Sequence, residues 1–219
     1  MTIWAIIPVK PLRDGKSRLS HILSADERAA LTSKFLNHTL ATLTKVSAIT
    51  RTLVISRDPA VLKIARPHGA QTFGEGEKQD LNQALTRATH IAAAQNASGV
   101  LVLPADLPFV TPEDVEMMLM ELAPAVNGNG QHRLPYHARA MIICPDEVDD
   151  GTNGLYISPP VGFNFHYGPQ SYHHHLAEAK RLGMSARVVH TPGLKFDLDS
   201  EADWQTYLAL TGRVQYEMA

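Results

Sequence analysis

Three aspartates stand where an acidic side chain can bind a metal ion. Asp106 follows the apolar run 100–103, which has the composition of a strand buried on both faces. Asp197 and Asp199 are separated by one residue, so their side chains point to the same side of an extended chain. Such hard oxygen ligands suit Mg²⁺, which proteins usually hold with one or two carboxylates and substrate phosphates. The three residues predict a Mg²⁺ site; the alternative is that Asp197 and Asp199 cap the helix expected from Ser200.

A basic loop follows the first apolar run of the chain. Lys10, Arg13, Lys16 and Arg18 surround Gly15 directly after that run. Glycine lets a backbone approach a phosphate closely, and lysine and arginine neutralise the phosphate charge. The loop therefore predicts phosphate binding, with a solvated basic turn as the alternative.

A donor-rich turn and an expected helix start form a second candidate site. Thr152 lies in the polar turn 149–154, and Gly168 and Ser171 flank Pro169 where a helix is expected to begin. The free N–H groups of a helix N-terminus favour an anion. These residues are predicted to hold a phosphate or carboxylate of a small substrate; the alternative is a helix start without a ligand.

Other conspicuous residues are assigned to structure rather than to chemistry. The run His173-His174-His175 cannot face one ion, because consecutive helical residues point about 100° apart, so a solvated helix face is expected. Cys144 lies within an expected strand and is interpreted as packing. The three methionines within residues 117–120 are likewise expected to pack in the core.

Apolar periodicity and turn signals predict the elements that must position these residues. The capping-box sequence Ser24–Glu27 begins one expected helix. Further helices are expected at 59–65, 80–94, 111–122, 170–182 and 200–210. Strands are expected at 3–9, 53–56, 70–73, 99–103, 139–144, 155–157, 187–190 and 195–198. Because strands and helices alternate in the first half, the fold class is α/β with a mostly parallel central sheet.

The second half of the chain is less regular. Its strands are expected at an edge of the sheet, with a lid over the site, and residues 125–138 are expected to form a mobile surface loop. The sequence shows no internal repeat and no linker, so residues 1–219 are predicted to form one domain.

The composition excludes several classes of protein. Lys and Arg number 20 and Asp and Glu 22, a net charge of −2 that argues against a nucleic-acid partner. A single cysteine excludes an internal disulfide. No apolar run approaches the roughly 20 residues of a membrane span, and the first residues lack the basic start of a signal peptide. A cytoplasmic enzyme or binding protein is expected.

Several short motifs together resemble one enzyme family. They are Pro8–Pro11 with Lys16–Leu19, Pro104–Pro108, Asp150–Asn153, Tyr167–Pro169 with Ser171, and Asp197–Asp199. With these motifs in this order, the chain resembles the 2-phospho-L-lactate guanylyltransferase family of coenzyme F-420 biosynthesis. The resemblance implies a Rossmann-like GT-A nucleotidyltransferase fold with helices on both faces of the sheet. It also implies transfer of GMP from GTP to 2-phospho-L-lactate, phosphoenolpyruvate or 3-phospho-D-glycerate.

The resemblance also implies a role for each candidate residue. Asp106, Asp197 and Asp199 would hold Mg²⁺, and Thr152, Gly168 and Ser171 would hold the acid substrate. Lys16 and Arg18 would contact the triphosphate and act with Asp106 in catalysis. The nucleotide site would comprise Lys10, Lys16, Arg18, Asn82 and Asp106.

The sequence departs from the family pattern at three places. Asp80 stands where a glycine is expected beside the nucleoside, and Gln170 replaces a glycine at the substrate helix. The segment 125–138 is longer than usual. The last two departures could bear on which acid is accepted.

The implied reaction is an in-line displacement at the α-phosphorus of GTP. An oxygen of the substrate phosphate attacks and pyrophosphate leaves, and no general base is needed because that oxygen is already ionised. A molybdenum-cofactor-type nucleotidyltransferase is a rival, but it would carry a Gly-Gly turn where Pro8–Pro11 stands. A GT-A sugar transferase would carry its D-x-D at the end of the central strand, where only Asp106 stands. A non-catalytic GTP-binding regulator is a third reading, and the aromatic segment 163–172 could serve a homodimer.

Overall fold

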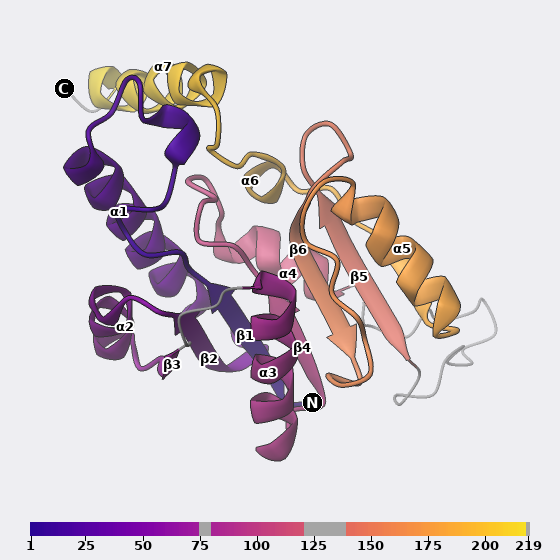
Figure 1. Cartoon of the computed structure of the whole chain (residues 1–219). Helices are drawn as coiled ribbons and strands as arrows, with labels where there is room; N and C mark the ends of the chain where they lie inside the picture. The colour runs from indigo at the N-terminus through magenta and orange to yellow at the C-terminus, as the bar shows by residue number, and fades with distance from the viewer. Residues whose placement is uncertain (75–79, 121–138, 218–219) are drawn as a thin grey trace.

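The computed structural model describes residues 1–74, 80–120 and 139–217. The strands in these ranges form one seven-stranded sheet in the order β3-β2-β1-β4-β6-β5-β7 (Figure 1). Only β6 runs antiparallel to its neighbours. The strands are β1 Ile3–Pro8, β2 Ile49–Ser56, β3 Gln71–Gly74, β4 Gly99–Val102, β5 Ala140–Pro145, β6 Thr152–Ser158 and β7 Ser185–Val188. The predicted mostly parallel sheet is confirmed, with β5 and β7 at one edge.

The helices α1, α2 and α3 begin at side chains that accept hydrogen bonds from their free N–H groups. Ser24 and Glu27 form the predicted capping box at the start of α1. The Asp58 and Asp80 carboxylates cap α2 and α3. The aspartate at position 80, where a glycine was expected, is thus explained by its role as the N-cap of α3. The helices are α1 Ala25–Leu43, α2 Pro59–Ala65, α3 Leu81–Ala94, α4 Pro112–Met120, α5 Ser171–Arg181, α6 Pro192–Lys195 and α7 Glu201–Glu217.

Helices cover both faces of the sheet, as predicted. Along β1, Ala5 and Ile7 face the core that contains α1, α2, α4 and α6. Trp4 and Ile6 face the opposite core, which contains α3 and α5. The alternation of side chains along a strand buries the apolar run of β1 on both sides.

A third cluster joins the basic loop to the C-terminal helix. Leu19 of the loop, Phe35 of α1 and Tyr207 of α7 pack together with Leu198. The rings of Phe35 and Tyr207 meet edge to face at 5.5 Å. Figure 1 shows α7 above the loop that follows β1, so the last helix helps to fix that loop.

Four expected strands differ from the structure. Strand β2 begins at Ile49, four residues before the expected 53–56. The strand expected at 195–198 is wrong: Pro192 begins the short helix α6, and the residues that follow it have no regular structure. Strand β7 begins two residues before the expected 187–190 and ends at Val188. Strand β6 already begins at Thr152, so Thr152 lies in a strand and not in a turn.

Two packing predictions were wrong in part. Met118 is fully buried, but Met117 and Met120 are 52% and 71% exposed, because only one side of α4 faces the sheet. His173 and His174 are exposed as expected, whereas His175 is fully buried. Cys144 is buried, as predicted.

Some predictions lie outside the described residues. They are the turn at 75–77, the end of the helix after residue 120 and the loop 125–138. Within the described ranges, the helices lack the combined length and apolar character that a bilayer crossing demands.

Candidate active site

The predicted acidic residues meet at the carboxyl end of β4. Asp106 follows this strand, and the N–H of Leu198 donates to the Asp106 carbonyl over 3.1 Å. This hydrogen bond places Asp197 and Asp199 beside Asp106, as the sequence predicted. In an open α/β sheet this edge is where ligands bind.

Lys16 is the cation at the centre of this acidic cluster. Its ammonium donates to Asp106 Oδ2 over 3.0 Å and also to the carbonyl of Leu198. The Lys16 side chain is only 5% exposed, and its backbone is left-handed with φ 54°. A non-glycine residue in that conformation is strained, and such strain gathers at functional sites.

The other two aspartates have polar partners of their own. Arg18 Nη1 lies 2.6 Å from Asp199 Oδ2 in an exposed ion pair. Asn153 Nδ2 donates to Asp197 Oδ1 over 3.2 Å, and to the carbonyl of Lys195 over the same distance. Arg18 and Asn153 thus orient the two carboxylates.

Burial, followed by the negative charge of Asp106, raises the pKa of Asp197 to about 6. A cation among these oxygens would relieve this cost, so the donor set fits Mg²⁺. In the described ranges, no three His, Cys, Asp or Glu residues are already arranged to hold a metal. In the structure, the ammonium of Lys16 supplies positive charge to the three aspartates.

The alternative role for Asp197 and Asp199, capping of α7, is taken by a capping box of Ser200 and Asp203, in which Ser200 Oγ accepts the N–H of Asp203 over 3.3 Å. Asp203 Oδ2 accepts the N–H of Ser200 over 2.6 Å and that of Asp199 over 3.0 Å. The Asp199 side chain turns instead to Arg18. Asp203 therefore leaves the carboxylates of Asp197 and Asp199 available to the site.

Thr152 and Ser171 form a buried hydroxyl pair, as their predicted common site requires. Their Oγ atoms lie 3.1 Å apart, and the two residues are 5% and 2% exposed. Gly168 adjoins them, since its carbonyl accepts the N–H of Ser171 over 3.2 Å. Gly168 has φ 139°, a conformation that side chains disfavour. The structure thus brings together the three predicted substrate residues.

The helix N-terminus beside this pair is already partly occupied. Asp150 Oδ2 accepts the N–H of Gln170 over 3.2 Å, and the Asp150 carbonyl accepts that of Tyr172 over 3.0 Å. Gln170 has φ 56°, which explains why a glycine suits this position. Because Asp150 already accepts from these backbone N–H groups, a ligand at this site would depend more on the hydroxyls of Thr152 and Ser171 for hydrogen bonds.

Asn82, predicted to bind the nucleotide, has its side-chain amide engaged within the protein. Its Oδ1 accepts the Tyr167 N–H over 2.7 Å, and its Nδ2 donates to the Tyr167 carbonyl over 3.2 Å. Asn82 therefore links the start of α3 to the segment before Gly168. Lys10 is exposed at the end of β1 and has no ion pair within the described ranges.

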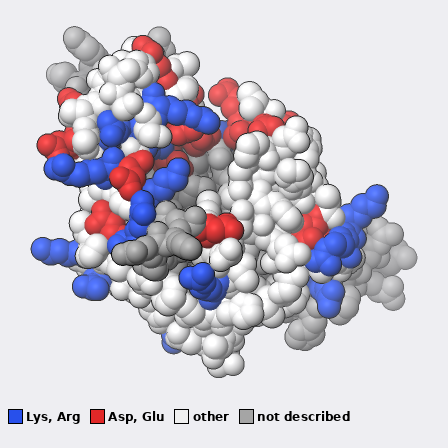
Figure 2. Space-filling model, viewed as in Figure 1, with Lys and Arg blue, Asp and Glu red and all other residues white. Residues whose placement is uncertain are grey.

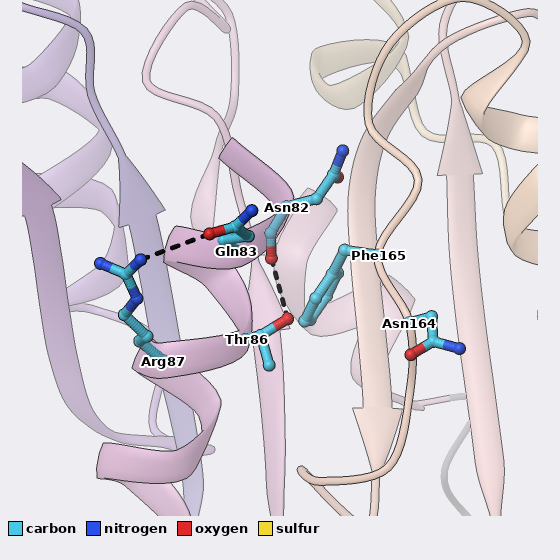
Figure 3. A pocket seen from close by; sticks show the side chains of 6 residues that line it. All are labelled: Asn82, Gln83, Thr86, Arg87, Asn164 and Phe165. Atoms are coloured by element: carbon cyan, nitrogen blue, oxygen red, sulfur yellow. Dashed lines mark hydrogen bonds between the residues drawn. The ribbon is translucent and has the colours of Figure 1, made fainter. Parts of the chain in front are cut away.

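A pocket of about 310 Å³ lies between α3 and the segment before α5. Figure 3 shows Asn82 at its upper end, the Phe165 ring facing α3, and Arg87 turned away toward Gln83. Its lining consists of Asn82, Gln83, Thr86, Arg87, Asn164 and Phe165. None of these lining residues has a carboxylate, so the pocket differs in its side chains from the cluster of Asp106, Asp197 and Asp199.

Opposite charges are interleaved over the basic loop and its neighbours. Figure 2 shows them at the upper left of the face, where α1, the loop and α7 lie. Ion pairs there include Arg13 with Asp26 and Arg18 with Asp199. The basic loop is therefore partly neutralised by protein carboxylates.

Comparison with known proteins identifies the family. The sequence model described as "Guanylyl transferase CofC like" matches residues 3–216. The chain belongs to the CofC-like guanylyltransferase family. It is 39% identical over 216 residues to a phosphoenolpyruvate guanylyltransferase of Rubrobacter xylanophilus, which covers 99% of this chain and 98% of that protein. It is 36% identical over 210 residues to one of Roseiflexus castenholzii, covering 95% and 89% of the two chains. The family resemblance inferred from sequence is confirmed, and the chain is an enzyme, a nucleotidyltransferase.

Solved structures support the fold of this guanylyltransferase. A CMP:2-keto-3-deoxy-manno-octonic acid synthetase superposes with a TM-score of 0.60 at 13% identity, covering 97% of this chain and 99% of its own. A 4-diphosphocytidyl-2C-methyl-D-erythritol synthase from Anaerococcus prevotii gives 0.58 at 13% identity, covering 96% of each chain. The predicted nucleotidyltransferase fold is therefore confirmed.

Sequence reasoning missed two polar residues of this CofC-like chain. Asn153 lies in the motif Asp150–Asn153, but nothing in the sequence around it indicates that it reaches Asp197. His175 was assigned to a solvated face, yet its Nδ1 lies 3.1 Å from Thr152 Oγ1. The spacing of Ser171 and His175, four residues apart on one helix face, was the available signal.

Proposed function

We propose that the chain transfers GMP from GTP to phosphoenolpyruvate and releases pyrophosphate, in coenzyme F-420 biosynthesis. The choice of acid is supported by the name phosphoenolpyruvate guanylyltransferase that its relatives carry at 39% and 36% identity. The related acids 2-phospho-L-lactate and 3-phospho-D-glycerate are the alternatives to be tested beside it.

The observation that carries this proposal is the start of β6. Thr152 hydrogen-bonds with Ser171 in the hydroxyl pair, and Asn153 hydrogen-bonds with Asp197 in the acidic cluster. Consecutive residues of a strand point to opposite faces. The start of β6 therefore contributes to two sites that this transfer requires. Thr152 belongs to the hydroxyl pair that would bind the acid substrate, and Asn153 contacts the aspartates that would bind the metal and the nucleotide.

The proposed chemistry relies on positioning and on neutralisation of charge. An oxygen of the substrate phosphate bonds to the α-phosphorus of GTP, and the bond to the departing pyrophosphate breaks. Lys16 and Arg18 supply positive charge for the triphosphate. Asp106, Asp197 and Asp199 would hold Mg²⁺, which when bound would supply further neutralisation of the phosphates. Gly168 and the hydroxyls of Thr152 and Ser171 would orient the acid.

The test is pyrophosphate release by the full chain with GTP, Mg²⁺ and each of the three acids in turn. Mass spectrometry of the product should show GMP joined to the acid through a diphosphate. We expect the highest kcat/KM with phosphoenolpyruvate and weak activity when ATP replaces GTP. GTP binding without pyrophosphate release for any acid would overturn the proposal and favour a regulator, whereas a preference for another acid would correct the substrate.

A further inference from the structure

A buried histidine stands behind the hydroxyl pair. His175 of α5 is fully buried. Its Nε2 lies 2.9 Å from the backbone nitrogen of His166, and its Nδ1 lies 3.1 Å from Thr152 Oγ1. Both ring nitrogens are therefore within hydrogen-bond distance of polar groups that flank the proposed acid site.

These contacts determine where the ring carries its proton. A backbone N–H can only donate, so Nε2 must accept the hydrogen bond from His166 and cannot carry a proton. A neutral ring then carries its proton on Nδ1, which donates to Thr152 Oγ1. Burial, aided by His166 and His174, lowers the pKa of His175 to about 3, so the ring is neutral at pH 7.

The state of the ring limits what the hydroxyl pair can do. Thr152 Oγ1 accepts from His175, and it shares one further hydrogen bond with Ser171 Oγ. The two hydroxyls have two protons between them, and their shared bond uses one. Within the described ranges, the other proton has no acceptor. One buried hydroxyl donor is therefore left for a ligand oxygen.

We propose that His175 is a positioning residue: by donating to Thr152 it leaves one hydroxyl proton of the Thr152–Ser171 pair to donate to an oxygen of the acid substrate. This inference rests on the proposed function and deepens it. The backbone donors of Gln170 and Tyr172 are engaged by Asp150, which increases the share of acid binding that falls to the hydroxyls.

The first test separates the affinity for the acid from that for GTP. His175→Phe keeps a ring against Phe163 and Tyr167 but removes both hydrogen bonds. We expect its KM for the acid to rise about tenfold, because the Thr152 hydroxyl loses the hydrogen bond from the ring that orients it toward the acid. Its KM for GTP should stay within about twofold. His175→Asn places an N–H near the Nδ1 position and should recover most of the affinity. His173→Phe, on the exposed face of α5, is the matched control.

A second test reads the ring directly and needs no turnover. A two-bond ¹H–¹⁵N spectrum of the full chain at pH 7 should show His175 protonated on Nδ1 alone. Protonation on Nε2 would overturn the inference, as would equal losses for both substrates in the well-folded Phe variant. The proposed function fails differently, since the wild-type chain would then release no pyrophosphate with any acid, whatever the state of His175.

Discussion

Asp106 carries the sharpest prediction for a single residue, because its carboxylate meets the buried ammonium of Lys16. Asp106→Asn keeps the shape of the side chain and removes its charge. We expect pyrophosphate release to fall about 100-fold, the usual cost of removing one electrostatic contact to a reacting group. Steady-state kinetics with circular dichroism checks this.

The matched control for this variant is Asp26→Asn, an aspartate in an exposed ion pair with Arg13. It should retain wild-type activity, since exposed pairs contribute little. Near wild-type turnover in Asp106→Asn would show that the acid has no role in the reaction.

His175 makes the folded state sensitive to acid. Its pKa is lowered to about 3 in the fold, against 6.5 in an unfolded chain. The stability gained from the neutral ring is therefore complete above pH 6.5 and is lost as pH falls toward 3. Over this range the free energy of unfolding of the wild type should fall by up to about 1.4 kcal/mol per pH unit more than that of His175→Phe.

Urea unfolding of both proteins at pH 7, 6 and 5 measures this difference directly. Subtracting the variant removes the contributions of the other titrating groups. Parallel curves would mean that His175 does not take up a proton on unfolding.

At the scale of elements, β6 separates two functions between neighbouring residues. Thr152→Val removes a hydroxyl from the acid site, and Asn153→Ala removes a donor to Asp197. We expect the first variant to raise KM for the acid about tenfold and the second to lower kcat at unchanged acid KM. Ser158→Ala, at the far end of β6, is the control. Identical kinetic effects of the first two variants would contradict this division.

Asn82 links two elements through both ends of its amide. If its role is to hold Tyr167 before Gly168, Asn82→Ala should raise KM for the acid by about three- to tenfold and leave KM for GTP unchanged. Gln83→Ala, on the same helix, is the control. A selective loss of GTP affinity would instead restore the role in nucleotide binding that the sequence predicted.

The sequence predicted elements best where local chemistry is strong. The Ser24 capping box and the run 100–103 lead directly to α1 and β4. Thr152 was misplaced because a polar, glycine-rich stretch resembles a turn, and only pairing with β5 makes it a strand. The helix α6 has four residues, too few for a periodic signal.

The site was predictable in its residue types but not in its connections. The family motifs supplied Asp106, Thr152 and Ser171, and the fold brings each to its expected cluster. The links from Asn153 to Asp197 and from His175 to Thr152 depend on packing across 44 and 23 positions in sequence. No local pattern encodes the contact of Asn153, and the four-residue spacing of Ser171 and His175 indicates only that these two residues share a helix face.

For the whole molecule, metal removal should separate activity from stability. Lys16 and Arg18 already pair with Asp106 and Asp199. EDTA should therefore abolish pyrophosphate release while lowering Tm by less than about 2 °C, since two of the three carboxylates keep a cationic partner. Thermal unfolding with and without EDTA, followed by addition of Mg²⁺, tests this. A large drop in Tm would show that the metal is structural. Light scattering, which measures the molar mass in solution, tests the predicted homodimer.

The reversed direction of β6 also constrains how this enzyme can change during evolution. Because this strand begins at the edge of the sheet where β4 and β5 end, the turn at 146–151 comes immediately before Thr152 and Asn153. Gain or loss of a single codon in that turn can shift the register of β6 by one residue. Thr152 and Asn153 would then exchange the faces of the sheet to which their side chains point. New substrate preferences should therefore arise by substitution along β6 and by length changes elsewhere, and a deletion scan across the turn should yield only inactive chains.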